Sequence, residues 1–352
     1  MPLKWSWAFG PETSSELNTL GQWGTVSTGN SQPVTTPVRT YAGSVGTRYS
    51  MNVKDSGNGM LQIPLNETSI TNRGWLSGYI FISNPTNFGN ESVIIVKGAG
   101  SGKDIRADAD SGTRVLNFYV NNVFIGTSSS LPHSTWHHVS IKFDISTTTW
   151  AGELWINGVQ EMTGTVSSMT TAETGFVGKF GSAHQPYAWV DGAFWSDITL
   201  YDDPADPCPV DQFVTRIAAD SDSSDNGAWN PASGGGQYGD LAPPIAVIPV
   251  VSEPTPSSGE NVVIETNILS VKLGISPTNI YGVTSHSYAA GTGGFSIFAD
   301  LAAAGVPVSV SGPASVIGSN TYVTVTAPLA DPGPPVLSWS PAMGVLLKTE
   351  VS

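Results

Sequence analysis

Short runs of β-branched and aromatic residues recur along the first 200 residues of this chain, each bounded by Gly, Asn, Pro or Ser. Residues 79–82 (Tyr-Ile-Phe-Ile) and 93–96 (Val-Ile-Ile-Val) are two examples, and such punctuated runs are typical of strands. Val139, Ile141 and Phe143 alternate with polar residues, as in a strand with one buried face. No window of a dozen residues before Asp203 has a helical apolar stripe. The sequence therefore predicts an all-β fold.

Two residue pairs predict the turns of β-hairpins. Asn121-Asn122 separates two apolar runs, and Asn tolerates the positive φ angles of a two-residue turn. Asn157-Gly158 follows an alternating run and is the strongest short-range hairpin signal. Residues 97–104 resemble a phosphate-binding loop only superficially, because Lys stands where the first Gly is required and Asp where Ser or Thr is required. We expect a hairpin connection there.

Composition divides the chain into three predicted parts. Residues 1–205 form a β-sandwich, residues 206–260 a connector and residues 261–352 a smaller C-terminal β domain. The connector begins with a short helix over residues 206–219, because apolar residues follow two prolines at helical spacing. These are Val210, Phe213, Val214 and Ile217. The rest of the connector is rich in Pro, Gly and Ser, which favours an extended spacer without secondary structure.

The charge of the chain excludes several classes of function. Fourteen basic and 28 acidic side chains give a formal charge of −14, and only 12% of residues are charged, against roughly a quarter in ordinary soluble domains. So acidic a chain lacks the basic surface that nucleic-acid binding needs. No apolar stretch approaches the roughly 20 residues of a membrane helix, and the N-terminus lacks the features of a signal peptide. We expect no membrane insertion and no export by that route.

Two stretches resemble a known family. Residues 136–144 (Trp-His-His-Val-Ser-Ile-Lys-Phe-Asp) and 152–158 (Gly-Glu-Leu-Trp-Ile-Asn-Gly) resemble the signature of laminin-G-like, concanavalin A-type sandwiches. Residues 175–178 and 190–202 are similar to the closing strands of that family. The resemblance covers about residues 1–203 and implies two packed antiparallel sheets in a jelly roll.

A second resemblance concerns the layout of the whole chain. Residues 213–217, followed by residues 227–234 (Gly-Ala-Trp-Asn-Pro-Ala-Ser-Gly), resemble a connector of bacteriophage virion proteins that precedes a distal β domain. Residues 343–348 are similar to the last strand of that domain. This resemblance implies a structural protein of a phage capsid, spike, tail or fibre, assembled in the cytoplasm of the bacterial host.

The sequence offers no catalytic constellation. Glucanases of the sandwich fold resemble one another in a strand with two glutamates and an aspartate on one face, where the glutamates are nucleophile and acid/base. Here Glu153 is followed by Leu-Trp and Asp191 by Gly-Ala, so that pattern is missing. Cys208 has no neighbouring base. We therefore predict no catalytic residue, no resident cofactor and no enzymatic activity; a glycoside hydrolase or lyase is the least favoured function.

Two groups of residues are candidates for metal binding. Asp104, Asp108 and Asp110 alternate on a predicted strand and would share a face, which is a weak hypothesis for calcium against a solvated acidic strand. His137 and His138 are adjacent, so they point to opposite faces of a strand and cannot chelate one metal together. We expect one of them to pack against an aromatic residue and the other to be solvated.

Tryptophan is the remaining candidate for binding. Ten of the 11 tryptophans lie at or before Trp229, and exposed indoles could stack on sugar rings. The alternative is that they fill the core and an oligomer interface, with Trp136 in the core.

Our preferred function is a non-enzymatic phage structural protein that contacts capsid or tail proteins and forms a homo-oligomer, with a trimer favoured. The alternative is a carbohydrate-binding module for host-surface glycans.

Overall fold

The computed structural model describes most of the first 214 residues and, beyond them, the strands alone. The described residues are 3–7, 9, 25–26, 31–39, 50–53, 61–63, 72–83, 91–110, 113–167, 172–181, 193–202, 205, 210, 212–214, 221–226, 230–231, 251–252, 261–265, 282–289, 295–303, 309–311, 315–317, 323–330 and 345–351. Side chains are described within the part that ends at Val214, apart from Leu3, Lys4, Thr25, Val26, residues 31–33 and Glu91.

Every regular element in these segments is a strand, so the predicted all-β fold is confirmed. None of the described residues belongs to a helix that could span a membrane. The short helix predicted over residues 206–219 is not formed at the described positions of that segment, which are Val210 and residues 212–214. These residues instead pack on the surface of the sandwich. Val210 lies against the hairpin turn at Gly158, and Gln212 joins a polar network with Thr199.

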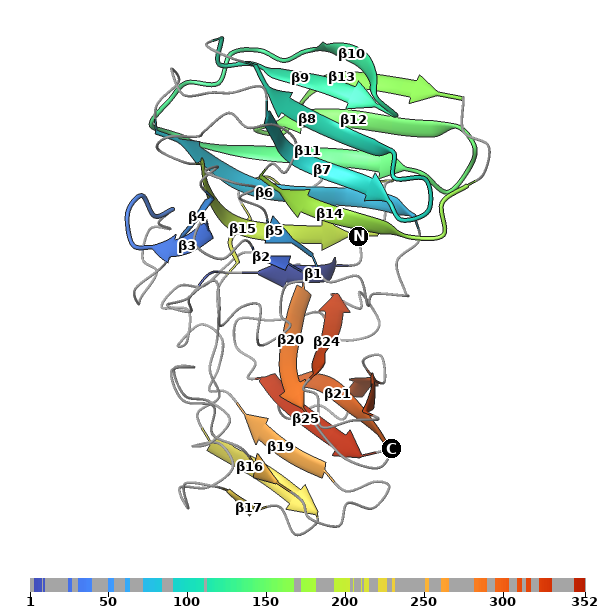
Figure 1. Ribbon diagram of the computed structural model, residues 1–352. Helices are drawn as coiled ribbons and strands as arrows, with labels where there is room; N and C mark the ends of the chain where they lie inside the picture. The colour runs from blue at the N-terminus through green and yellow to red at the C-terminus, as the bar shows by residue number, and fades with distance from the viewer. Residues whose placement is uncertain are drawn as a thin grey trace. The chain divides into compact units, whose positions relative to one another are not determined.

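The chain divides into two compact units (Figure 1). The first consists of Met1, Ser6–Thr40 and Thr47–Val214, and the second of Pro2–Trp5, Tyr41–Gly46 and Thr215–Ser352. The domain boundaries at residues 205 and 260 stay predictions.

An eight-stranded sheet, nearly all of it in the first unit, has the strand order β13-β12-β11-β6-β15-β4-β3, to which β1 is added by pairing with β15. Its strands are β13 (Val159–Val166), β12 (Trp150–Ile156), β11 (Trp136–Asp144), β6 (Arg73–Ile82), β15 (Ala193–Tyr201), β4 (Ser50–Val53), β3 (Ser31–Val34) and β1 (Leu3–Trp7). The strands from β13 to β3 are antiparallel to their neighbours.

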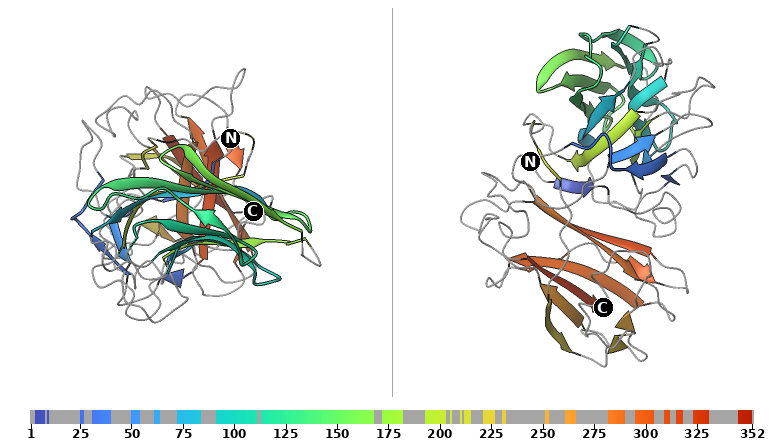
Figure 2. Two further views of the ribbon diagram at one scale, coloured as in Figure 1. Left: turned by 90° about the horizontal axis from the view of Figure 1, so that it is seen from above. Right: turned by 90° about the vertical axis from the view of Figure 1, so that its left-hand side faces the viewer.

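The second sheet of this unit has seven antiparallel strands in the order β10-β9-β8-β7-β14-β5-β2. These are β10 (Val123–Thr127), β9 (Leu116–Val120), β8 (Asp104–Ala109), β7 (Glu91–Gly98), β14 (Phe176–Phe180), β5 (Leu61–Gln62) and β2 (Thr25–Val26). Figure 1 shows the two sheets as separate layers, and Figure 2 shows the same layers from two other directions.

The core lies between the two layers. Alternate residues of β8, β9, β11 and β12 point inward and are almost completely buried, among them the predicted inward set Val139, Ile141 and Phe143. The sheets approach each other closely at Gly152, where an added Cβ would lie 2.9 Å from Ile105 of the opposite sheet. The first unit is therefore a β-sandwich of two packed antiparallel sheets.

Both predicted hairpin turns are confirmed. Asn121 and Asn122 have φ angles of 48° and 63°, and Asn157 and Gly158 have 51° and 80°. Two successive positive φ angles match the twist of antiparallel strands, and Asn and Gly tolerate them best. The phosphate-loop-like segment is also a hairpin turn, between β7 and β8, as predicted.

The turn between β7 and β8 is closed by a carboxylate from a distant segment. Gly100 N–H and Ser101 N–H donate to Glu173 at 2.7 and 3.0 Å. Burial tends to raise the pKa of Glu173, but the hydrogen bonds from Ser101 and Gly100 outweigh it, and the pKa is lowered. These turn amides therefore serve an internal carboxylate.

The second unit is described as strands only. Its sheets are β16-β19-β25-β21-β22 with β23 beside β21, the pair β20-β24 and the pair β17-β18. The strands are β16 (Ser221–Asn226), β17 (Asn230–Pro231), β18 (Val251–Ser252), β19 (Asn261–Glu265), β20 (Gly282–Ala289), β21 (Phe295–Ala303), β22 (Ser309–Ser311), β23 (Ser315–Ile317), β24 (Val323–Ala330) and β25 (Val345–Val351). The connector was predicted to lack secondary structure, and this is wrong for β16 to β18. Strand β16 pairs with β19, because ladder hydrogen bonds depend on the backbone and accept even a Ser- and Asp-rich strand.

Candidate functional site

The outer face of the eight-stranded sheet brings together polar and aromatic side chains from neighbouring strands. Lys142 of β11 lies directly opposite Trp75 of β6 on one side and Glu153 of β12 on the other. Directly opposite residues on antiparallel strands have adjacent Cβ atoms, and alternation places all three on the face away from the core. The register thus forms a continuous row of indole, ammonium and carboxylate.

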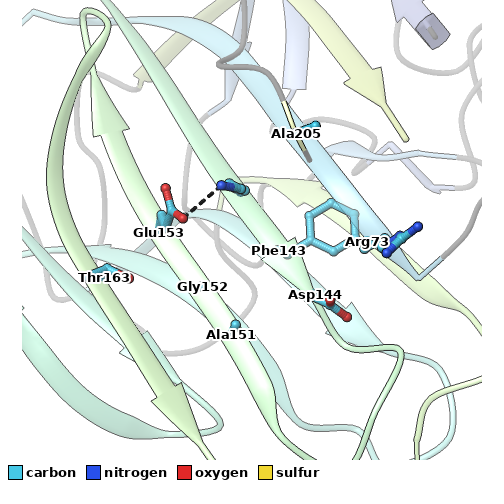
Figure 3. Close-up of a pocket in the computed structure, with 9 residues that line it drawn as sticks. Arg73, Phe143, Asp144, Ala151, Gly152, Glu153, Thr163 and Ala205 are labelled. Carbon is cyan, nitrogen blue, oxygen red and sulfur yellow. Dashed lines mark hydrogen bonds and ion pairs between the residues drawn. The ribbon is translucent and has the colours of Figure 1, made fainter. Parts of the chain in front are cut away.

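A hollow of about 420 Å³ lies on this face (Figure 3). It is lined by Arg73, Lys142, Phe143, Asp144, Ala151, Gly152, Glu153, Thr163 and Ala205. Its rim therefore carries two cations, two carboxylates and a hydroxyl, while the small side chain of Ala151 leaves space between them. Trp155 stands beside it on the strand that carries Glu153.

The charged groups of the hollow are held in place by contacts within the protein. Lys142 Nζ forms an ion pair with Glu153 Oε1 at 2.9 Å, and Trp155 Nε1–H donates to Glu153 Oε2 at 2.8 Å. The rings of Trp155 and Trp75 meet edge to face with centroids 5.5 Å apart. Asp144 accepts from the N–H and hydroxyl of Ser146. The half-buried indole of Trp155 is thus fixed next to a polar hollow.

Another part of the outer face is covered by the chain itself. Gln212 is buried against the sheet, and its Nε2 donates to Ser77 Oγ at 3.0 Å and to Thr199 Oγ1 at 2.9 Å. The same nitrogen lies 3.2 Å from His138 Nε2, and Tyr201 Oη–H donates to Gln212 Oε1 at 2.9 Å. This carboxamide therefore satisfies polar groups that the sheet would otherwise present to solvent.

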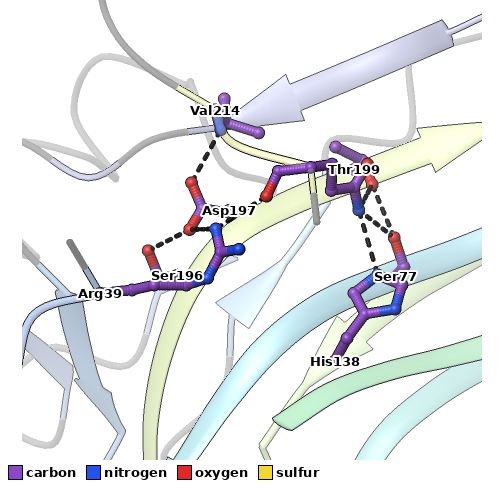
Figure 4. Close-up of polar contacts among 8 residues, drawn as sticks. Arg39, Ser77, His138, Ser196, Asp197, Thr199 and Val214 are labelled. Atoms are coloured by element: carbon purple, nitrogen blue, oxygen red, sulfur yellow. Dashed lines mark hydrogen bonds and ion pairs between the residues drawn. The ribbon is translucent and has the colours of Figure 1, made fainter. Parts of the chain in front are cut away.

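A buried ion pair fastens this covering segment (Figure 4). Arg39 Nη1 donates to Asp197 Oδ2 at 3.0 Å and to the Gln212 carbonyl at 2.7 Å. Asp197 is fully buried and also accepts from Val214 N–H and Ser196 Oγ–H. Its φ angle of 51° interrupts β15 at the bulge that turns the carboxylate toward these donors.

The histidine pair is only partly as predicted. The two rings lie on opposite faces of β11 by alternation, but both are buried, and the expected solvated histidine is wrong. His138 packs against Tyr79, with ring centroids 4.9 Å apart, and lies under Gln212. Burial, and next the charge of Arg39, lower the pKa of His138 to about 3. It is therefore a neutral hydrogen-bonding partner at ordinary pH.

The predicted calcium face is occupied by a guanidinium. Asp104 and Asp108 do share a face of β8, but Arg106 stands between them and pairs with Asp104 at 2.6 Å and with Asp108 at 2.9 Å. Asp110 accepts from Thr113 Oγ1. Within the described segments, no three His, Cys, Asp or Glu side chains gather as metal ligands. Arg106, which the sequence hypothesis did not weigh, supplies the positive charge instead.

The tryptophans divide between core and surface. Trp5, Trp7, Trp150 and Trp195 are buried, as the core interpretation predicted. Trp75 is buried as well, but on the outer face of the sheet opposite Lys142. Trp136 was assigned to the core, and this is wrong, because it is half-buried on the outer face against Phe81. Trp155 is half-buried beside the hollow. Cys208, Trp23, Trp189 and Asp191 lie outside the described residues.

Sequence reasoning missed the residues that cover and border the site. Arg39 and Asp197 are 158 residues apart, and Gln212 is 135 residues from Ser77. No local pattern joins such positions. Alternation along each strand places Lys142 and Glu153 on the polar face of β11 and of β12. Only the strand register shows that the two residues lie opposite each other.

Comparison with known proteins gives loose structural likenesses only. No family model matches the chain, and no curated protein matches it. The catalytic domain of a glycoside hydrolase family 131 protein from Coprinopsis cinerea aligns with a TM-score of 0.40 and 13% identity, over 60% of this chain and 99% of that one. Domain 4 of a family 43 arabinanase from Geobacillus stearothermophilus aligns with a TM-score of 0.39 and 13% identity, over 58% and 95%.

Two further solved structures are similar at the same level. The cellulose-induced protein Cip1 aligns with a TM-score of 0.35 and 15% identity, over 49% of this chain and 85% of that one. A sialidase from Trypanosoma rangeli aligns with a TM-score of 0.34 and 12% identity, and the chain spans only 27% of the sialidase. These likenesses are too loose to carry an argument about function, which rests on the site itself.

Proposed function

We propose that this chain is a non-enzymatic β-sandwich protein that binds a saccharide in the hollow on its eight-stranded sheet. The observation that carries the proposal is the half-buried indole of Trp155 held beside a hollow of about 420 Å³ with charged and hydroxyl groups on its rim. Sugars offer apolar C–H faces to an aromatic ring and hydroxyls to polar groups, so such a mixed surface suits them.

Binding of the full chain to a glycan array tests the proposal. Replacing Trp155 by Ala should weaken the best glycan about tenfold or more, because aromatic anchors dominate such contacts. The matched control is Trp136→Ala, since Trp136 is also half-buried on the outer face but packs on Phe81 away from the hollow. An array without hits, or equal losses in the two variants, contradicts the proposal.

We propose binding rather than catalysis because both carboxylate oxygens of Glu153 already have partners within the protein. A glycosidase uses two carboxyl groups that flank the scissile bond. Oε1 of Glu153 instead pairs with the ammonium of Lys142, and Oε2 accepts from the indole N–H of Trp155. The full chain incubated with varied polysaccharides should release no reducing ends, and release that is lost in Glu153→Gln would establish a hydrolase instead.

For the biological setting we propose a bacteriophage particle, where a saccharide-binding sandwich would serve attachment to a host surface. Support comes from the sequence layout of sandwich, connector and distal β unit, and from the low charged fraction of 12%. Mass spectrometry of purified particles should find the chain beside capsid or tail proteins. We also propose a homo-oligomer, with a trimer favoured; a stable monomer in light scattering at micromolar concentration would contradict it.

A further inference from the structure

The seven-stranded sheet carries a second unusual surface, on the face turned away from the core. Strands β14, β7, β8, β9 and β10 are neighbours in this sheet (Figure 1). Their register aligns one side chain from each strand in a row across the sheet. We call them the aromatic–cationic row: Lys179, Ile95, Arg106, Tyr119 and Phe124. With neighbouring strands about 4.8 Å apart, the row is about 19 Å long. Lys97 lies two residues from Ile95 on β7 and therefore shares this face.

The aromatic end of the row is exposed. Phe124 is 54% exposed and is one of three large apolar side chains among the described residues with such exposure. Its ring packs against Tyr119 with centroids 5.6 Å apart, and the guanidinium of Arg106 lies 4.4 Å from the Tyr119 centroid. The row thus continues from an exposed aromatic ring to a stacked cation.

Arg106 is held rigidly but keeps part of its donor capacity. Its Nη1 donates to Asp104 and to Asn122, and its Nε donates to Asp108. Within the described segments its Nη2 makes no hydrogen bond, so that edge of the guanidinium is left for a ligand. A guanidinium fixed in this way loses little freedom when it binds a carboxylate.

The two lysines of this face are unpaired among the described residues. They lie on adjacent strands and on the same face, because Lys97 stands opposite Val177, two residues from Lys179. The pKa of Lys179 is lowered by burial and next by the charge of Lys97, with Asp104 acting in the opposite direction. An anion placed between the two ammonium groups would relieve that repulsion. The same face also carries Asp104 and Asp108, which Arg106 holds, so three cations and two carboxylates lie together there in a chain whose net charge is −14.

We propose that the aromatic–cationic row binds a carboxylated polysaccharide, with carboxylates between Lys97, Lys179 and Arg106 and sugar rings against Tyr119 and Phe124. A uronate polymer carries apolar ring faces and lateral carboxylates on one stiff chain, which matches aromatic and cationic groups set at strand spacing. An acidic peptide fits less well. Extended peptides pair along a sheet edge, whereas this row runs across the strands on the face of the sheet, from β14 to β10. The site is separate from the hollow on the other sheet.

Binding of the full chain to polygalacturonate, measured by calorimetry at low salt, tests the inference. The neutralised double variant Lys97→Gln/Lys179→Gln should bind about tenfold more weakly or worse, because two charge-assisted contacts are removed, and Phe124→Ala should weaken binding severalfold. The matched control Lys103→Gln removes an exposed lysine of the nearby β7–β8 turn, and should change affinity less than twofold. Trp155→Ala should leave this binding unchanged, which separates it from the proposed site in the hollow.

Four results would overturn the inference. The first is no binding of polygalacturonate by a folded chain, and the second is equal binding of a neutral galactan. The third is a double variant that keeps its circular dichroism spectrum and the full affinity. The fourth is displacement of polygalacturonate by polyglutamate at equal carboxylate concentration with no effect of Phe124→Ala, which would mean that the face recognises charge alone.

Discussion

His138 provides the sharpest test of how the covering segment is held. The ring is buried under Gln212, and burial together with the charge of Arg39 lowers its pKa to about 3. An unfolded histidine has a pKa near 6.5. Between these two values the unfolded chain binds a proton that the folded chain does not, so the free energy of unfolding falls as the pH falls. Above the unfolded pKa the contribution is fully present.

The size of the effect follows from the two pKa values. Between pH 7.5 and pH 5.0 the proton uptake of the unfolded state should lower the free energy of unfolding by about 2 kcal/mol. Replacing His138 by Gln removes that titration while it keeps a polar, neutral side chain beside Gln212. The variant should therefore lose about 2 kcal/mol less than the wild type over this pH interval, whatever its stability at pH 7.5.

Urea unfolding followed by tryptophan fluorescence measures the difference. Ten of the 11 tryptophans lie at or before Trp229, so the signal comes mainly from the sandwich. His133→Gln is the matched control, because His133 is exposed in the turn before β11. Between pH 7.5 and 5.0 this variant should lose about as much free energy of unfolding as the wild type. Equal losses of stability for wild type and His138→Gln between pH 7.5 and 5.0 would refute the reasoning.

Three further substitutions test contacts of the sandwich. Asp197→Ala removes the fully buried carboxylate that binds Arg39, Ser196 Oγ–H and Val214 N–H, and should lower the free energy of unfolding by about 3–5 kcal/mol in urea titrations; a loss below about 1 kcal/mol would contradict the contribution of this ion pair. Gly158→Ala places a Cβ 2.6 Å from Val210 at a φ of 80° and should cost about 1–2 kcal/mol, whereas an unchanged melting temperature would speak against the packed segment. Glu173→Gln should cost about 1–2 kcal/mol at pH 7 and less at pH 3, since the lowered pKa of Glu173 makes its contribution disappear as the pH falls; a cost independent of pH would show that the charge is irrelevant.

The local elements of the sandwich could be predicted because their causes are local. Asn121-Asn122 and Asn157-Gly158 form turns because these residue types accept positive φ angles at low cost. The alternation around Ile141 gave the buried face of β11, since side chains of a strand alternate between its two faces. The helix expected near Val210 failed because apolar spacing alone does not distinguish a helical stripe from a segment that packs against a surface.

The candidate site was not predictable in the same way, because it depends on register and on distant pairing. Nothing near Glu153 in the sequence indicates that Lys142 lies opposite it, and a shift of one residue would turn either side chain to the other face. Likewise, Asp104 and Asp108 suggested a cation site, while the side chain between them, Arg106, supplies the cation itself.

By itself, the sequence determined that this chain folds into strands joined by tight turns, because turn chemistry and alternation act over a few residues. Only the tertiary structure decided which polar side chains are buried and which remain for ligands. Gln212 and Arg39 reach the outer face of the sheet from segments far apart in the chain, and burial depends on what covers a surface. The same reason explains why His138 is buried while Trp136, two residues earlier, remains half-exposed.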